Sequence, residues 1–420
     1  MSAASVRAMR RGACPSLPAP MQTGDGLLAR LQPMEPLTLD QLAGLAALAS
    51  ELGNAIVEVT ARGKLQLRGL TPASAPHLAA GVDALGIEVQ PGFPVETSAL
   101  AGLDPAEVFD PRPLAQAISN AASGLVPGLA PKVSVVVDGG GSQHLRALKA
   151  DIAVTAGGGG RLLVRLAGVA AGEVVPEWAV TSVVGLLEQL AACGPAARMA
   201  ELVAREGIDA LRASAGLTPA ADRACPPAEP VGVHSLTDGT LALGLGLGFG
   251  QVEAGALAGL AAAARDAGAR CVEPASGRAL LVIGLAPETA RQLRATAEGL
   301  GFITDPQDVR RRVIACSGAP ACGSARMETH ALAAALAGAL APSIAHGDVH
   351  VSGCAKGCAH PARALVTIVG LDEGMGLVVE GTPRDVSAQD VLGRDVPVAR
   401  LAEMVREMLR KTSAMKKDPA

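Results

Sequence analysis

The stretch LAGLAALASELG at Leu42–Gly53 recurs as LAGLAAAARDAG at Leu257–Gly268, 215 positions further along the chain. The same offset pairs Val57-Glu58 with Val272-Glu273. Alanine-rich helices can match by accident, but a constant offset that also includes non-alanine positions indicates an internal repeat. We therefore expect two pseudo-symmetric halves within the 420 residues.

Each copy of the repeat predicts the order strand, helix, strand, helix. In the first copy, Thr38 and Gln41 have the spacing of a capping box, and Gly53 is placed to end the helix that follows. The sequence IVEVTARGKLQLRGL at Ile56–Leu70 predicts a hairpin with Gly63 at its turn. A second helix, over about residues 74–85, would complete an α+β unit with its helices on one face of an antiparallel sheet.

A different and longer segment follows each copy. Its strand-like runs and amphipathic helices are expected at Val133–Val137, Leu162–Leu166 and Trp178–Leu190 after the first copy, and at Val313–Ala315, Val349–Val351, Ala364–Val369, Leu377–Glu380 and Leu401–Leu409 after the second. The proline- and alanine-rich stretch Leu217–Pro230 predicts a linker between the halves.

The composition excludes several classes of protein. Hydrophobic residues make up 49% of the chain and charged residues 18%, which permits a large core. Four Phe, one Trp, no Tyr and a net charge of −4 argue against a nucleic-acid partner. No apolar run reaches the roughly 18 residues of a membrane span, and no secretory signal is visible. We therefore expect a cytoplasmic protein without a membrane partner.

The cysteines indicate one metal site. Eight cysteines in 420 residues are too few for a disulfide scaffold. Four of them form two spaced pairs, Cys316 with Cys322 and Cys354 with Cys358. Structural zinc sites prefer two to four residues between paired cysteines, so the five in the first pair are atypical, although zinc stays the alternative. An iron–sulfur cube is larger than one ion, and the glycines and proline of both loops suit it.

Further motifs carry a resemblance to a known family. The repeat and the C-x5-C and C-x3-C pairs resemble the sirohaem-dependent sulfite and nitrite reductases. The stretches Arg11–Leu31, Thr60–Leu70, Leu100–Glu107 and HVSGCAKGCAHP at His350–Pro361 are most similar to one branch, the precorrin-3B synthase family. The resemblance extends from about residue 11 to residue 411.

The resemblance implies an α+β fold in which each half combines a ferredoxin-like half-domain with a larger α/β domain. The implied ranges are 12–95 and 96–216 (the latter without a cluster), a linker at 217–230, then 231–305, the iron–sulfur domain at 306–411 and a tail at 412–420. It also implies a [4Fe–4S] cluster on the four cysteines and a mononuclear non-haem iron.

The activity implied is a monooxygenase reaction of aerobic cobalamin biosynthesis. Precorrin-3A would be hydroxylated with dioxygen and a ring acetate closed into a lactone, giving precorrin-3B. Electrons would come from NADH, through a donor protein, to the cluster. Two alternatives stay open: a sirohaem-dependent sulfite or nitrite reductase on the same fold, in which sirohaem is bound, and an iron–sulfur electron-transfer protein.

A precorrin carries many carboxylates, so its site should be basic. On a strand with period two, Arg62, Lys64, Gln66 and Arg68 would share one face, and Arg30 lies on the preceding strand. We expect this basic row to contact the substrate. The competing interpretation is a solvated strand edge, because alternating charges are ordinary there.

Other substrate-binding residues follow from the resemblance. Lys132 matches a lysine that contacts tetrapyrrole carboxylates in the reductases, which often have a second lysine where this chain has Ser134. This departure weakens the case for sulfite or nitrite reduction. Around the cysteines, Arg326, Lys356 and His360 are expected to meet ligand carboxylates or to stabilise the cluster's charge.

A second iron could bind at His346, Asp348 and His350, which would share one face of a strand. Two histidines and a carboxylate suit ferrous iron that activates oxygen. Glu328 and His330 are rival ligands. The usual triad is dispersed in sequence, so a loop with solvated polar groups is the favoured interpretation of this segment.

Overall fold

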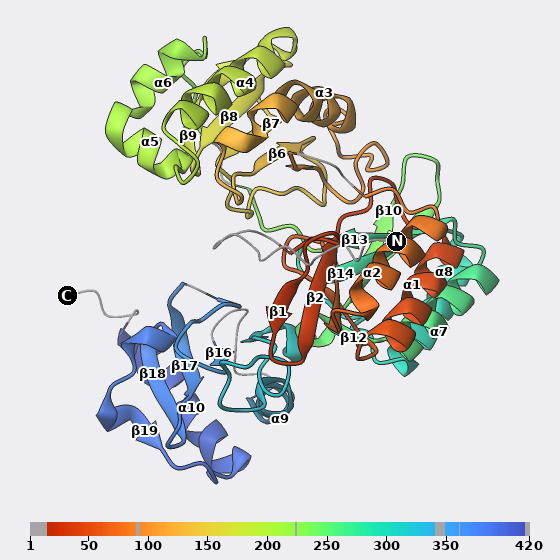
Figure 1. The fold of residues 1–420 in the computed structure, drawn as a ribbon, viewed down its shortest axis with the longest axis vertical. Coiled ribbons are helices and arrows are strands. Elements are labelled where there is room, and N and C mark those ends of the chain that lie inside the picture. Colours follow the sequence, from red (N-terminus) through yellow and green to blue (C-terminus); the bar gives the residue numbers. More distant parts are fainter. Residues whose placement is uncertain (1–14, 90–92, 223–224, 341–348, 361, 416–420) are drawn as a thin grey trace.

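The structure, a computed structural model, describes residues 15–89, 93–222, 225–340, 349–360 and 362–415. Within these ranges the strands form four sheets (Figure 1). Two of the sheets belong to the repeated copies and two to the segments that follow them. The described residues contain no helix that is long and apolar enough to cross a membrane.

The two copies of the repeat fold alike. The first contains β1 (Met21–Thr23), β2 (Gly26–Leu31), α1 (Leu39–Leu52), β3 (Ile56–Val59), β4 (Leu65–Leu70) and α2 (Ser74–Ala84). The second contains β10 (Gly232–Ser235), β11 (Leu241–Gly246), β12 (Gln251–Glu253), α7 (Ala254–Asp266), β13 (Cys271–Ala275), β14 (Ala279–Leu285) and α8 (Pro287–Gly299). The predicted capping box is present, because the Thr38 hydroxyl accepts from the Gln41 N–H and the Gln41 side chain returns to the Thr38 N–H. Gly63 has a φ of 73°, as the predicted turn requires.

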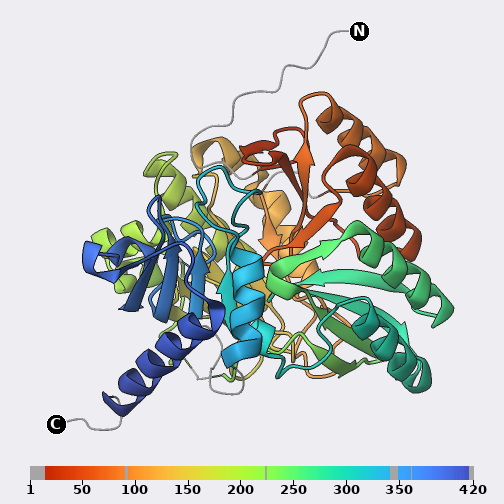
Figure 2. The same ribbon diagram turned by 90° about the horizontal axis from the view of Figure 1, so that it is seen from below.

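Each copy pairs a short segment with the sheet of the other. β12 pairs antiparallel with β3, so that Val252 lies opposite Val57. In return, Leu37 of the first copy bridges to Val272 on β13. The two copies also share one hydrophobic core, in which α1 packs beside α7. Both helix layers lie on the outer side of the molecule, away from the two larger domains (Figure 2).

The segments that follow the copies share one topology. The first has the strand order β5-β6-β7-β8-β9, with two parallel and then two antiparallel pairings, and the second repeats this pattern as β15-β16-β17-β18-β19. The strands are β5 (Val95–Glu96), β6 (Val135–Asp138), β7 (Ile152–Ala156), β8 (Leu162–Leu166), β9 (Val169–Val174), β15 (Val313–Ala315), β16 (Val349–Ser352), β17 (Ala364–Gly370), β18 (Met375–Gly381) and β19 (Val391–Leu392). The duplication therefore includes the larger domains, and the expected α+β fold of two halves is confirmed.

Helices cover these two sheets. They are α3 (Arg112–Ala122), α4 (Pro176–Ala192), α5 (Met199–Glu206) and α6 (Ile208–Ser214) in the first domain, and α9 (Thr329–Leu340) and α10 (Val398–Met415) in the second. The sequence analysis placed α4 and α10 but not β7, β9, α3 or α9. The linker after Leu217 lies against the first domain, where Thr218 bridges to Glu173 and the Gln143 side chain donates to the Glu229 carbonyl.

Candidate functional site

A cavity of about 700 Å³ lies where both copies of the repeat meet the C-terminal domain. The first copy contributes residues of β2, β3 and β4 and the β1–β2 turn, the second contributes the turns beside β12 and β14, and the C-terminal domain contributes the cysteine loops. Its polar and reactive lining residues are Gln22, Thr23, Arg30, Glu58, Thr60, Gln66, Arg68, Arg278, Cys316, Ser317, Cys322, Ser324, His330, Ser352, Cys354, Lys356 and Cys358.

All four cysteines of the predicted site line this cavity. Cys316 and Cys322 lie in the loop after β15, and Cys354 and Cys358 lie in the loop after β16. The two loops are joined by a backbone hydrogen bond from Arg326 N–H to the Gly353 carbonyl, 2.7 Å long. Because β15 and β16 are parallel neighbours, their carboxyl ends bring both loops to one edge of the sheet.

The environment of these thiols fits an iron–sulfur cluster. Burial raises the pKa of Cys358, and the other three thiols raise it further, which places all four within electrostatic reach of one another. The Gly353 N–H donates to Cys316 Sγ over 3.1 Å, which is the kind of backbone contact that stabilises a cluster's negative charge. Among the described side chains, no three His, Cys, Asp or Glu are grouped as a single metal ion requires.

Glycine is required where the β1–β2 turn of the first copy contacts the loop that contains Cys316 and Cys322. A Cβ on Gly24, in the β1–β2 turn, would lie 2.0 Å from the Gly323 nitrogen and 2.5 Å from the Cys322 carbonyl carbon. Gly353 is equally confined, because its Cβ would lie 2.7 Å from the Ala325 Cβ. The cysteine loops are therefore packed against backbone, and no side chain separates them from the β1–β2 turn.

The corresponding loops of the first α/β domain contain no cysteine. Asp104, after β5, instead accepts hydrogen bonds from the N–H and the hydroxyl of Ser142, after β6, both over 2.6 Å. The Val108 N–H donates to the Gly139 carbonyl between the same loops. Direct hydrogen bonds thus join the two loops that carry the thiols in the second half.

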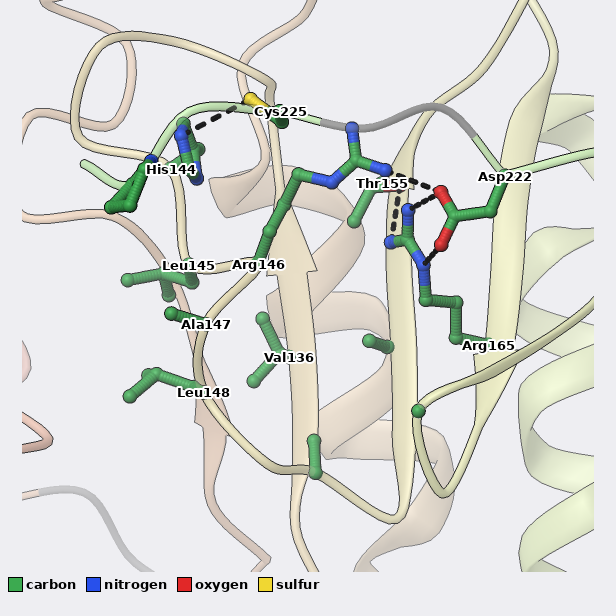
Figure 3. Close-up of a pocket in the computed structure, with 14 residues that line it drawn as sticks. Val136, His144, Leu145, Arg146, Ala147, Leu148, Thr155, Arg165, Asp222 and Cys225 are labelled. Carbon is green, nitrogen blue, oxygen red and sulfur yellow. Dashed lines mark hydrogen bonds and ion pairs between the residues drawn. The ribbon is translucent and has the colours of Figure 1, made fainter. Parts of the chain in front are cut away.

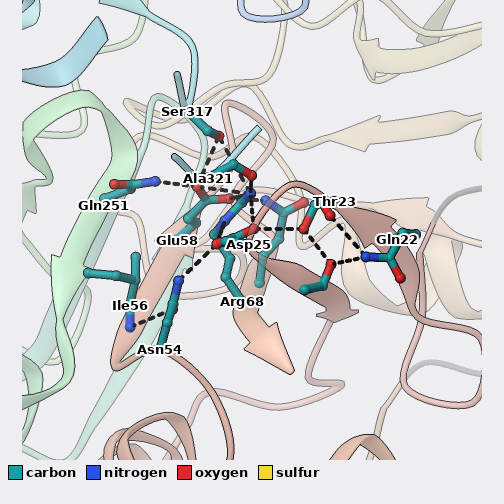
Figure 4. A network of polar contacts seen from close by, with 12 residues as sticks. Gln22, Thr23, Asp25, Asn54, Ile56, Glu58, Arg68, Gln251, Ser317 and Ala321 are labelled. Atoms are coloured by element: carbon teal, nitrogen blue, oxygen red, sulfur yellow. Dashed lines mark hydrogen bonds and ion pairs between the residues drawn. The ribbon is translucent and has the colours of Figure 1, made fainter. Parts of the chain in front are cut away.

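One wall of the cavity is an ion-pair network around Arg68, which is 4% exposed (Figure 4). Its guanidinium pairs with Asp25 at 3.0 Å and with Glu58 at 3.3 Å, and it donates to the Ala321 carbonyl at 2.7 Å. Glu58 also accepts from the side-chain amides of Gln66 and Gln251, both at 2.5 Å. The network therefore joins both copies of the repeat to the cysteine loop.

Three other cations around the cavity carry no ion pair with the described residues. Arg30 donates only to the neutral Gln66 amide oxygen, at 2.6 and 3.0 Å, and Lys356 donates to the Ser324 hydroxyl at 2.8 Å. The side chain of Arg278 has neither a hydrogen bond nor an ion pair there, and its burial lowers the pKa of the guanidinium against the opposing effect of Glu58. Cations that lack an ion pair among the described residues favour an anionic ligand.

The basic row expected on one strand face divides between two cavities. Gln66 and Arg68 lie on β4 beside Arg30, as expected, but β4 begins only at Leu65. Arg62 and Lys64 belong to the preceding turn, so the period of two does not extend to them. Both pair with Glu96, at 2.7 and 3.0 Å, and line a separate cavity of about 410 Å³ that faces the first α/β domain.

The remaining predicted residues lie outside the lining of the 700 Å³ cavity. Lys132 is exposed just before β6, and Arg326 is exposed and pairs with Asp372. The His360 ring lies edge-on to the His350 ring, with 5.6 Å between ring centroids.

His346 and Asp348, two of the three proposed iron ligands, lie outside the described residues. His350, on β16, is fully buried, and neither of its ring nitrogens has a hydrogen-bond partner. Burial and the neighbouring His360 lower the pKa of His350 to about 4, so its imidazole is neutral at pH 7. Of the rivals, His330 lines the cavity against Phe249, whereas Glu328 is exposed.

Arg278, Asp25 and Glu58 were not among the site residues predicted from the sequence. Glu58 was noticed only as part of the repeat, and Arg278 falls opposite Gly63 under the 215-residue offset, so the repeat gave no reason to single it out. An Arg at the turn of the second hairpin, where the first copy has glycine, is the signal that could have identified it.

A smaller pocket of about 310 Å³ lies between the first α/β domain and the linker (Figure 3). There, Arg146 and Arg165 both pair with Asp222 of the linker. Cys225 Sγ lies 3.3 Å from His144 Nε2, which also contacts the Pro226 carbonyl at 2.8 Å. Because a carbonyl only accepts, Nε2 carries the proton and cannot serve as a base toward the thiol.

Comparisons with known proteins agree with this architecture. Residues 20–85 match the family described as the nitrite/sulfite reductase ferredoxin-like half domain. A precorrin-3B synthase from Sinorhizobium sp. is 41% identical over 421 residues, covering 96% of this chain and 91% of the relative. A ferredoxin–nitrite reductase from Synechococcus elongatus is 33% identical over 141 residues, covering 30% of this chain and 28% of that protein. The solved structure of the Mycobacterium tuberculosis NirA protein superposes with a TM-score of 0.72 at 19% identity, covering 91% of this chain and 80% of NirA, and shows the shared fold.

Proposed function

This chain belongs to the precorrin-3B synthase family, and from that premise we propose that it converts precorrin-3A to precorrin-3B. In this reaction, one atom of dioxygen enters the macrocycle as a hydroxyl group and the other leaves as water, which consumes two electrons and two protons. Closure of a ring acetate on the macrocycle then gives the lactone.

The observation that carries the proposal is the 700 Å³ cavity, which combines four thiols with three cations that have no ion pair among the described residues. Its volume lies in the range of pockets that enclose organic ligands. Arg30, Arg278 and Lys356 all line this cavity, and they come from the first copy, the second copy and the C-terminal domain. A macrocycle with carboxylates on its rim would satisfy all three charges at once.

The chain's own residues bind and orient the substrate in this proposal. Arg30 and Arg278 offer planar guanidinium forks to carboxylates, which fix direction as well as position. Lys356 supplies a third point of attachment beside the cysteine loop. The apolar contact of Phe249 with the His330 ring, 5.4 Å between centroids, borders the same space. Substrate held at three points in a half-enclosed cavity has its reacting carbon fixed relative to the thiols.

Cys316, Cys322, Cys354 and Cys358 would hold a [4Fe–4S] cluster, which supplies single-electron transfer to the site. The electrons would originate from NADH and arrive through a donor protein. The described residues do not assemble the ligands of a second, mononuclear iron. No step of the proposal depends on that ion.

The test is anaerobic purification with counts of iron and sulfide, followed by incubation with precorrin-3A under isotopically labelled dioxygen. We expect about four irons and four sulfides per chain and one labelled oxygen atom in the product. A Soret band of bound sirohaem together with reduction of sulfite or nitrite would replace this proposal with a reductase. A protein that contains the cluster but does not bind a tetrapyrrole would indicate an electron carrier.

A further inference from the structure

Arg68 is the most completely engaged cation of the cavity wall. Its Nε–H donates to Asp25 Oδ2 at 3.1 Å, and its Nη2 group donates to Asp25 Oδ1 and to the Ala321 carbonyl at 3.0 and 2.7 Å. Its Nη1 group faces Glu58 at 3.3 Å and the Ser317 hydroxyl at 3.5 Å. A guanidinium has five N–H groups, and this set of acceptors occupies them. Nothing remains with which Arg68 could bind a ligand carboxylate.

We propose that Arg68 is a positioning residue that holds the Cys316–Cys322 loop in the geometry the cluster needs, rather than a substrate ligand. This inference rests on the cluster assigned above. It separates Arg68 from Arg30 and Arg278, which line the same cavity but have no ion pair among the described residues.

The two residues of the loop that Arg68 contacts are sequence neighbours of Cys316 and Cys322, the two proposed cluster ligands in that loop. Ser317 directly follows Cys316, and Ala321 directly precedes Cys322. One guanidinium therefore fixes both ends of the loop at neighbouring residues. Its other partners are Asp25, in the β1–β2 turn, and Glu58, on β3. Arg68 therefore fixes the position of the loop relative to the sheet of the first copy. The close approach of Gly24 to Gly323 leaves no space for the loop to move toward the β1–β2 turn.

Charge gives Arg68 a second effect on the same loop. The side chains of Asp25 and Glu58 are only 11% and 10% exposed, and Arg68 is the cation that pairs with both. Without it, two largely desolvated carboxylates would face a loop whose cysteines would carry negative charge as ligands of the cluster. Like charges in a poorly solvated site repel strongly, so the loop would be pushed away from the sheet.

The experiment compares Arg68→Gln and Arg68→Lys with the unsubstituted holoenzyme, and uses Arg30→Gln as the matched control. Arg30 lies on the strand beside β4 and lines the same cavity, but has no contact with the cysteine loop. The readouts are iron and sulfide per chain, the rate at which the cluster's visible absorption decays in air, and the electron paramagnetic resonance spectrum of the reduced cluster.

We expect both Arg68 variants to lose cluster absorption at least tenfold faster than the control and to give an altered resonance spectrum. Lysine keeps the charge but cannot reach Asp25, Ser317 and Ala321 together, so it should rescue only part of the loss. Arg30→Gln should keep the unsubstituted spectrum and decay rate while weakening ligand binding.

Arg68 variants with full iron, unchanged decay and unchanged spectrum, but weaker substrate binding, would overturn the inference. If Arg68→Gln does not fold, Asp25→Asn removes one anchor more gently and must still accelerate decay. Absence of a cluster from the unsubstituted protein would refute the proposed function itself, which keeps the two failures distinguishable.

Discussion

Arg278 offers the sharpest test of substrate binding, because its loss should weaken binding without weakening the fold. Its side chain is largely desolvated in the cavity wall and has no ion pair or hydrogen bond with the described residues. Replacement by glutamine removes the charge but keeps a β-carbon, so the positive φ of 62° imposes the same strain on both proteins. The change therefore isolates the guanidinium.

The magnitude follows from what the guanidinium would contribute. A hydrogen bond to a charged partner is worth about 1.5–3 kcal/mol. We therefore expect Arg278→Gln to raise the Kd for precorrin-3A by about 10- to 150-fold. Since the desolvation cost of the Arg278 charge exceeds the favourable effect of Glu58 in the free protein, the free energy of unfolding should stay level or rise.

The assay is a spectroscopic titration of the anaerobic protein with precorrin-3A, with urea unfolding followed in parallel. Arg326→Gln is the matched control, because Arg326 is exposed and pairs with Asp372 outside the cavity lining. It should leave the Kd unchanged. The reasoning is refuted if Arg278→Gln binds as tightly as the unsubstituted protein, or if it loses stability as a structural arginine would.

Three further outcomes are expected. Cys354→Ser should remove the brown cluster absorption and the turnover together, as iron analysis and product assay would show; persistence of both would exclude Cys354 as a ligand. Burial raises the pKa of Glu107 to about 7, with Asp104, Asp110 and Asp138 adding to the effect and a hydrogen bond from Gly102 opposing it. Because the pKa of Glu107 in the folded state exceeds the ordinary value of about 4.5, the free energy of unfolding should fall as pH rises from about 4.5 to 7 and then level off. Glu107→Gln should flatten this slope in urea unfolding measured from pH 4.5 to 8. An unchanged slope would show that other groups cause it. Leu67 is fully buried in the core shared by both copies, so Leu67→Ala should cost about 2–5 kcal/mol and shift the unfolding of both copies together; separate transitions would mean that the copies fold independently.

The repeat was the part of the fold that the sequence predicted best. Helix caps and apolar spacing are local signals, and Thr38, Gln41 and Gly53 place α1 without reference to the rest of the chain. The cysteine site was equally predictable, because all four cysteines lie in two short loops and their spacing can be recognised without knowledge of the fold. Lining of one cavity by all four cysteines follows from the parallel pairing of β15 with β16.

The division of the basic residues could not be predicted from spacing. A period of two holds only within a strand, and the strand begins at Leu65, so Arg62 and Lys64 turn toward Glu96, a residue more than thirty positions away. Two partners of Arg68 are also remote in sequence: Asp25 reaches it across the sheet of the first copy, and Ala321 reaches it only after the C-terminal domain has packed against that sheet. Whether an arginine is free or already paired depends on such distant contacts, which no local pattern encodes.

The reciprocal pairing of short segments between the copies bears on how this protein arose. A single copy with this geometry would leave a row of unpaired backbone groups at the margin of its sheet, and an open margin invites another chain. Two identical chains could close both margins by trading strands about a twofold axis, forming a symmetric dimer with two equal sites. Joining those chains end to end would preserve the closure and release the sites from equality, which agrees with one pair of loops that carries thiols and another that carries an aspartate and a serine.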